Sequence, residues 1–290
     1  MSLEPSRLPF TQHIAVVAPG VRLSFEQTGI GDPRVIFLHA TGFSGSCWRP
    51  HAEQLAESMS SVLVDLRGHG RSSKPPEPYR WAYFVDDIVS LLDEGDWRGV
   101  ILCGHSVGGA TAIQVAARRP DRVSALVLVE PVVPEPRGAP REGASESPLI
   151  ERTRRRRASW DSREAAAEYL RQRAPYDSWD RSVFDAWVDT GLTDSGTGDI
   201  ELSCPPWVEA SVFAETAGSG AAADLADLRI PTWIARATGD RGMRSTCDPS
   251  VAQRIPGARE VVVERSGHFL PLEDIGLVVR LIHEARAASS

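Results

Sequence analysis

The stretch VILCGHSVGGATAIQVAARR, residues 100–119, places a serine between a strand pattern and a helix pattern. VILC is a continuous apolar run, as in a buried strand, whereas AIQVAARR repeats its apolar residues at helical spacing. Ser106 therefore falls in a sharp strand-to-helix turn. Gly104 and Gly108 flank it because the chain there passes too close to its neighbours for Cβ atoms. Such a turn strains the serine backbone and projects the hydroxyl out of the sheet, at a helix N-terminus that favours developing negative charge.

The same alternation of strand and helix patterns continues on both sides of this turn. Apolar runs rich in β-branched residues lie at 34–40, 61–66, 99–105, 125–131, 231–237 and 259–265. Helical patterns lie at 48–59, 84–95, 109–119 and 276–287. Near-continuous apolar strands are buried on both faces, so the pattern predicts an α/β fold with a mostly parallel central sheet flanked by helices. The runs 12–18 and 21–27, joined by Pro19-Gly20, predict an antiparallel hairpin at the sheet edge.

The alternation stops at Pro131 and resumes at Pro231. We therefore expect residues 132–228 to form a helical cap, inserted after the sixth strand between the two parts of the core, 1–131 and 229–290. This segment holds half of the chain's eight tryptophans: Trp160, Trp179, Trp187 and Trp207. They form either the cap's own small core or an apolar wall of a substrate site.

The composition excludes several classes of protein. With 290 residues, 42% hydrophobic residues and a net charge of −7, the chain is globular and has no general attraction to nucleic acid or anionic membranes. No apolar run reaches the ~20 residues of a membrane span and the start lacks the apolar stretch of a signal peptide, so a cytoplasmic location is expected. Four scattered cysteines, without CxxC or histidines at zinc-ligand spacing, predict reduced thiols and no metal site.

Four consecutive arginines, Arg154 to Arg157, interrupt the acidic balance. On a helix they span more than one turn, so they cannot all face one ligand. Most are expected to be solvated or paired with neighbours such as Asp161 and Glu164. The alternative is that one of them points into the cleft and holds a substrate carboxylate.

Together these motifs resemble the α/β-hydrolase superfamily, in its serine-nucleophile branch. The segment 104–108, Gly-His-Ser-Val-Gly, matches its nucleophile turn, and 39–43, His-Ala-Thr-Gly-Phe, matches the loop after its third strand, with Ala40 where glycine is usual. The resemblance implies an oxyanion hole formed by the backbone N–H groups of Thr41 and Val107. It also implies that His39 holds this loop by hydrogen bonds. We expect the loop 65–72, DLRGHGRS, to be structural, with tight-turn glycines and an Asp/Arg pair.

The resemblance also implies a base and an acid for Ser106. His268 follows the strand 259–265, where the family places its catalytic histidine, and the order serine, acid, histidine is kept. The favoured acid is Asp240, three residues beyond the strand 231–237. The alternative acid is Glu130, at the end of the strand 125–131. If Glu130 is not the acid, it needs a partner such as a cap arginine or backbone N–H groups.

These residues predict acyl transfer to Ser106 followed by hydrolysis, without a cofactor. The expected substrate is a small or medium apolar carboxylic ester, and the expected partner is a small acyl compound rather than nucleic acid or a membrane. A serine at position 106 argues against the epoxide hydrolase and haloalkane dehalogenase branches, which use aspartate there. Carbon–carbon bond hydrolysis, thioester or lactone hydrolysis, and a slow-turnover ligand receptor remain open alternatives.

Overall fold

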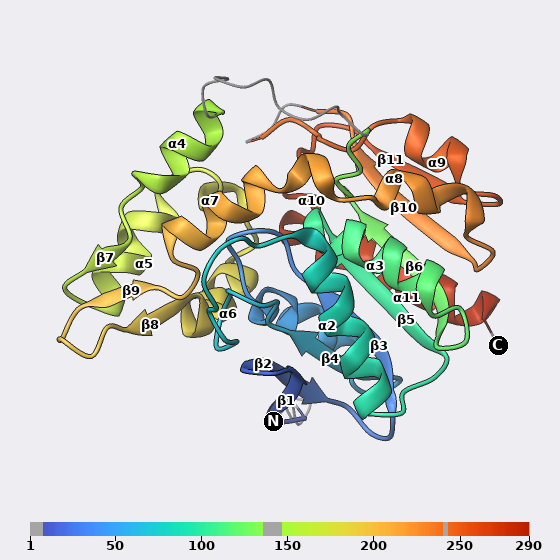
Figure 1. Cartoon of the computed structure of the whole chain (residues 1–290), viewed down its shortest axis with the longest axis horizontal. Coiled ribbons are helices and arrows are strands. Elements are labelled where there is room, and N and C mark those ends of the chain that lie inside the picture. The colour runs from blue at the N-terminus through green and yellow to red at the C-terminus, as the bar shows by residue number, and fades with distance from the viewer. Residues whose placement is uncertain (1–7, 136–146, 240–242, 290) are drawn as a thin grey trace, which may run out of the picture.

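An eight-stranded sheet runs through the protein (Figure 1), which the computed structural model describes over residues 8–135, 147–239 and 243–289. The strand order is β1-β2-β4-β3-β5-β6-β10-β11. The strands are β1 Thr11–Ala18, β2 Val21–Thr28, β3 Pro33–Leu38, β4 Ser60–Val64, β5 Val100–His105, β6 Val123–Val129, β10 Thr232–Ala237 and β11 Arg259–Val263. Each strand predicted from the sequence is present.

The sheet is parallel from β4 to β11, and only the β1–β2 and β2–β4 pairs are antiparallel. The predicted hairpin thus forms β1 and β2, with β1 at the edge. In the centre, Phe37 of β3 lies opposite Leu63 of β4 and Cys103 of β5. Since the parallel strands all end at the same edge, the loops after β3, β5, β6, β10 and β11 meet there.

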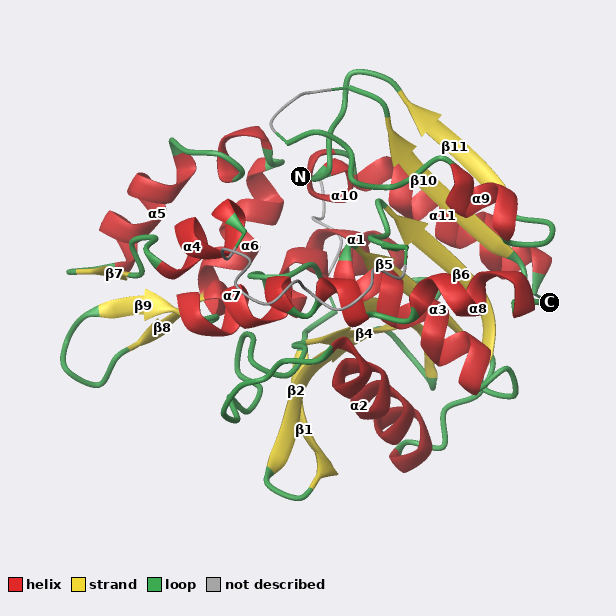
Figure 2. Cartoon of the chain, turned by 45° about the horizontal axis from the view of Figure 1, so that its top comes forward, coloured by secondary structure: helices red, strands yellow, loops and turns green. Residues whose placement is uncertain are grey.

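Helices cover both faces of the sheet, as Figure 2 shows. On one face, α2 Trp81–Glu94 and α3 Val107–Arg118 pack against Ile36 and Leu38 of β3. On the other face, α1 Arg49–Leu55 and α11 Ile275–Ala288 pack against Val35 and Phe37. The alternation of side chains along β3 therefore feeds two separate apolar cores. Two short helices, α9 Ser250–Arg254 and α10 Leu270–Glu273, complete this part.

The segment between β6 and β10 lies beside the main sheet, at the left in Figure 1. Its helices are α4 Pro148–Arg154, α5 Arg163–Arg171, α6 Arg181–Gly191, α7 Pro206–Ala214 and α8 Ala221–Asp224. It is not purely helical as expected, because it also holds a three-stranded antiparallel sheet of β7 Ser159–Trp160, β9 Ile200–Leu202 and β8 Leu192–Asp194. The turn between β8 and β9 uses Gly196 and Gly198 at positive φ, which lets two short strands pair.

In the described ranges, four 3₁₀ turns lie between these elements: η1 Gly45–Trp48, η2 Tyr176–Ser178, η3 Thr216–Gly218 and η4 Leu225–Asp227. At its end the segment returns to the main sheet, since Ala221 and Ala222 of α8 are buried in the same core as α3. None of the helices in the described part of the chain is long and apolar enough to cross a membrane.

Candidate active site

Ser106 lies in the turn between β5 and α3 that the sequence predicted. Its backbone is strained, with φ 57° and ψ −118°, and it is the N-cap residue of α3. A Cβ on Gly104 would lie 2.4 Å from the carbonyl oxygen of Gly108, and a Cβ on Gly108 would lie 2.3 Å from that of Leu38. Both glycines are therefore required by backbone contacts.

His268 faces Ser106 from the loop after β11. Its Nε2 is 3.1 Å from Ser106 Oγ, and both residues are buried. Two main-chain hydrogen bonds hold the histidine: its N–H donates to Met243 O at 2.8 Å, and its carbonyl oxygen is 2.7 Å from His105 Nε2. Burial lowers the pKa of His105 well below its usual value, so the ring is neutral and donates from Nε2. His105, which the sequence analysis treated only as part of a motif, thus anchors His268.

Glu130 lies on the other side of the His268 ring. It follows β6 with φ 49°, is fully buried, and its Oε2 is 3.3 Å from His268 Nδ1. Its carboxylate also accepts hydrogen bonds from Ala237 N–H (2.6 Å), Ser245 Oγ–H (2.8 Å) and Thr246 N–H (3.1 Å). These donors compensate for the loss of water around a buried charge.

Only one of the two candidate acids lies within the described residues. The structure places Glu130, the alternative acid of the sequence analysis, at the imidazole nitrogen that faces away from Ser106. Asp240, the favoured one, lies outside the described residues.

The loop after β3 lies against the start of α3. The same Cβ placed on Gly108 would lie within 2.8 Å of His39 O, so the turns that carry Thr41 and Val107 adjoin. His39 has the expected structural role: its Nε2 accepts Leu66 N–H at 3.0 Å, and its Nδ1 donates to Ala40 O at 2.8 Å. Burial keeps this ring neutral by lowering its pKa. The oxyanion role of the Thr41 and Val107 amides stays a prediction.

The loop 65–72 is structural as expected, but its ion pair was assigned wrongly. Asp65 accepts main-chain N–H groups of Gly45 and Arg71, both at 2.8 Å, and Arg67 pairs with Asp87 of α2 at 2.5 Å. Burial raises the pKa of Asp65 to about 6, and the N–H groups oppose this shift. Asp65 therefore joins the loops after β3 and β4 through main-chain hydrogen bonds.

The four tryptophans of the segment 132–228 lie in different surroundings. Trp160 and Trp187 are buried, with ring centroids 5.7 Å from Tyr169 and 4.7 Å from Tyr176. Trp207 is 39% exposed. These positions favour a structural interpretation for Trp160 and Trp187. Trp179 differs because it also reaches across to the main sheet's loops.

Phe43 and Phe269 connect Trp179 to His268. The ring of Phe43, two residues beyond Thr41, lies 4.7 Å from that of Trp179 and 5.9 Å from that of Phe269. Phe269 follows His268, and their rings are 5.4 Å apart. The buried aromatic cluster beside His268 is therefore partly made by residues that the sequence analysis did not single out.

The arginines 154–157 have other partners than Asp161 and Glu164. Arg154 pairs with Glu77 at 3.5 Å, Arg155 pairs with Glu151 at 2.8 Å, and Arg157 lies over the rings of Trp160 and Tyr169.

Arg156 is the arginine of this run that turns inward. It donates to Glu209 at 2.8 Å and to the hydroxyl of Tyr176 at 3.2 Å. Glu209 in turn lies over the loop after β3, where a Cβ on Gly42 would be 2.9 Å from its Oε1. Burial raises the pKa of Glu209, and Arg156 opposes this shift. A substrate carboxylate at Arg156 remains a hypothesis, and the observed partner is Glu209.

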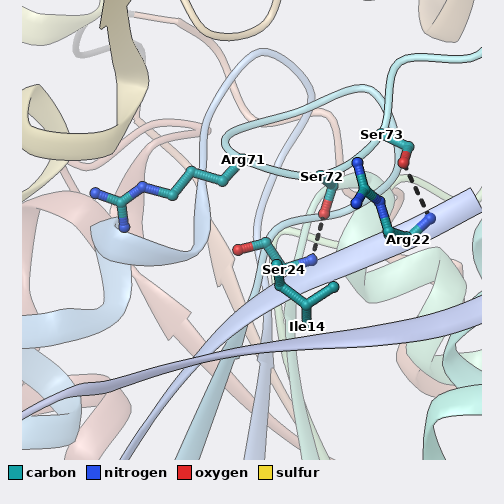
Figure 3. A pocket seen from close by; sticks show the side chains of 6 residues that line it. All are labelled: Ile14, Arg22, Ser24, Arg71, Ser72 and Ser73. Atoms are coloured by element: carbon teal, nitrogen blue, oxygen red, sulfur yellow. Dashed lines mark hydrogen bonds between the residues drawn. The ribbon is translucent and has the colours of Figure 1, made fainter.

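A separate pocket of about 190 Å³ lies between the β1–β2 hairpin and the loop after β4 (Figure 3). It is lined by Ile14, Arg22, Ser24, Arg71, Ser72 and Ser73. The hydroxyls of Ser72 and Ser73 accept main-chain N–H groups of β2 at 2.9 and 3.0 Å. These hydrogen bonds attach the hairpin to the loop after β4. None of the candidate catalytic residues lines the pocket.

Comparison with known proteins identifies the family. The model of the alpha/beta hydrolase family matches residues 35–281. The chain belongs to this family. As a member, it has the α/β-hydrolase fold.

Three relatives illustrate the likeness. The 2-(acetamidomethylene)succinate hydrolase of Mesorhizobium japonicum is 25% identical over 86% of each chain. Lipase LipV of Mycobacterium tuberculosis is 40% identical over 36% of this chain and 39% of its own. A crystal structure of E-2-(acetamidomethylene)succinate hydrolase superposes with a TM-score of 0.78 at 19% identity, covering 97% of this chain and all of the other. The matched region spans about a third of the length of three mycobacterial relatives that are 34% identical to it.

Proposed function

We propose that this α/β hydrolase cleaves small or medium acyl compounds through an acyl-enzyme on Ser106, with His268 as base and Glu130 as the acid that orients it. The observation that carries the proposal is the continuous contact from Ser106 Oγ to His268 Nε2 (3.1 Å) and from His268 Nδ1 to Glu130 Oε2 (3.3 Å). We favour Glu130 over Asp240, the acid favoured from the sequence, because the Glu130 carboxylate faces Nδ1, whereas Asp240 lies outside the described residues.

The chemistry follows from these positions. His268 Nε2 accepts the proton of Ser106 as Oγ attacks the acyl carbon, and Glu130 stabilises the imidazolium through the Nδ1–H. The N–H groups of Thr41 and Val107 stabilise the oxyanion of the tetrahedral intermediate, with the N-terminus of α3 contributing its dipole. His268 then protonates the leaving group and activates the water that hydrolyses the acyl-enzyme.

The side chains beside this triad favour an apolar acyl or aryl group. Phe43, Phe269 and Trp179 form a continuous aromatic cluster next to His268. Such surfaces favour the apolar part of an ester over a charged one.

A second candidate is an amide substrate that bears carboxylates. The relative that aligns over 86% of each chain is named for hydrolysis of 2-(acetamidomethylene)succinate, and Arg156 turns a cation toward the interior beside Tyr176. Direct comparison of the two substrate classes separates these candidates.

The test is a panel of p-nitrophenyl esters of increasing acyl length, run beside thioesters, lactones and acetamido dicarboxylates. We expect the highest kcat/KM for an uncharged ester. Ser106→Ala should lower turnover on the order of a million-fold and abolish labelling by a fluorophosphonate probe, while the variant still folds. More than a few per cent of wild-type activity in Ser106→Ala would refute the acyl-enzyme. Labelling of Ser106 without turnover of the panel would favour the slow-turnover receptor.

A further inference from the structure

A second oxygen contacts the catalytic imidazole at the nitrogen that faces Glu130. The hydroxyl Oγ1 of Thr246 lies 2.9 Å from His268 Nδ1, closer than the 3.3 Å of Glu130 Oε2. One N–H can be shared between two acceptors on the same side. The position therefore supplies two acceptors for a single ring proton.

Thr246 is held in this place by the carboxylate itself. Its main-chain N–H donates to Glu130 Oε2 at 3.1 Å. The preceding residue, Ser245, donates its hydroxyl to Oε1 at 2.8 Å and accepts Cys247 N–H at 3.3 Å. Ser245 and Thr246 thus donate to the two carboxylate oxygens of Glu130. Oε2, the oxygen that faces His268 Nδ1, is also the one that accepts the Thr246 N–H.

The direction of the Thr246 hydrogen bond follows from its neighbour. A hydroxyl can donate or accept, but an ionised carboxylate can only accept. With Glu130 beside Nδ1, the ring proton resides on Nδ1, and Thr246 Oγ1 accepts it. Nε2 is then unprotonated and free to accept the proton of Ser106.

Thr246 differs in exposure from the two residues that it contacts. Glu130 and His268 are buried, whereas Thr246 is exposed at the surface. The hydroxyl thus contacts a buried imidazole from a residue that is itself exposed.

We propose that Thr246 is a positioning residue for His268: it accepts the Nδ1–H together with Glu130 and fixes the plane of the ring toward Ser106. Glu130 selects the tautomer and balances the charge, and Thr246 fixes the orientation. This inference rests on the proposed function, since it assigns a role around the same base.

The test compares Thr246→Val, which keeps the shape and removes the hydroxyl, with Thr246→Ser, which keeps the hydroxyl. We expect Thr246→Val to lower kcat about ten-fold with little change in KM, because Thr246 acts through His268 rather than on substrate. Thr246→Ser should stay within about three-fold of wild type.

The pH dependence supplies a readout that a merely structural role would not move. Among the residues that the structure describes, the titratable side chains in contact with the ring are Glu130, from the end of β6, and His105, from the end of β5, whose ring centroid is 5.0 Å away. Neither is altered in these variants. Removing an acceptor of the Nδ1–H destabilises the imidazolium, so the acidic limb of kcat/KM should move to lower pH in Thr246→Val and stay in place in Thr246→Ser.

Three results would overturn the inference. One is an unchanged rate and acidic limb in Thr246→Val. Another is equal losses in the valine and serine variants, which would assign the effect to packing. The third is a faster Thr246→Val enzyme, which would mean that the hydroxyl donates to Nδ1 and holds the unproductive tautomer. The Ser106→Ala variant tests the proposed function separately. If Ser106→Ala is inactive and one of these three results is found, the role of Thr246 is wrong while the proposed function stands.

Discussion

Replacing Glu130 by glutamine keeps the size of the side chain but exchanges one carboxylate oxygen for an NH₂ group. If the amide oxygen keeps the position of Oε1, it still accepts Ala237 N–H and Ser245 Oγ–H, and the NH₂ group then faces Thr246 N–H and His268 Nδ1. Nδ1 then accepts from this NH₂ group, which outweighs the Thr246 hydroxyl as the remaining acceptor for an Nδ1–H, and the ring proton moves to Nε2, where it blocks the base. We expect kcat to fall by about 10³- to 10⁴-fold, the scale of a triad acid changed in this way, or about 4–5.5 kcal/mol in the barrier.

Folding should be affected much less. One buried donor loses its acceptor, which costs about 1–3 kcal/mol of stability. The assay is kcat for the best ester of the panel, together with a thermal melt of each variant. Glu130→Asp, which keeps the charge but retracts it, should retain more activity than Glu130→Gln.

Asp240→Asn is the matched control for the other candidate acid. If Glu130 acts on His268, Asp240→Asn should stay within about ten-fold of wild type. A loss of 10³-fold or more in Asp240→Asn, with less than ten-fold in a folded Glu130→Gln, would refute the reasoning and restore Asp240 as the acid.

Three further outcomes are expected. Gly108→Ala should destabilise the fold by about 1–3 kcal/mol and lower activity at least ten-fold, because its Cβ would lie 2.3 Å from a carbonyl oxygen of β3; an unchanged melt and rate would contradict the close approach. Arg156→Gln should cost about 3–5 kcal/mol at pH 8, and less at pH 5, where the buried carboxyl of Glu209 can take a proton. The sign follows because burial raises the folded-state pKa of Glu209, so the ionised form costs stability as pH rises; Arg155→Gln, on the surface, should change little, and equal losses of Arg156→Gln at both pH values would contradict the argument. Trp179→Ala should shift acyl-length preference ten-fold or more with chemistry retained, and an identical profile in a folded variant would remove it from the substrate site.

Much of this protein can be read from the sequence, because the signals are local. A continuous apolar strand, a glycine-flanked serine and a helical repeat follow one another in residues 100–119, and each depends on close neighbours in the chain. The same holds for the hairpin around Pro19-Gly20 and for His268 after β11. The ring of His39 likewise binds residues within its own loop and the next, as expected.

What the sequence left open depends on where side chains meet across the sheet edge. β6 and β10 are neighbouring parallel strands, so the positions after both, Glu130 and Asp240, can supply a carboxylate to the same histidine. Only the tertiary structure placed the Glu130 carboxylate at Nδ1 and brought the hydroxyl of Thr246 beside it. The partner of Arg156 could not be predicted from the local sequence either, because Glu209 lies 53 positions further along the chain. The position of a residue just after a strand determines the edge of the sheet at which it lies. The direction of its side chain depends on the packing of elements that are distant in sequence.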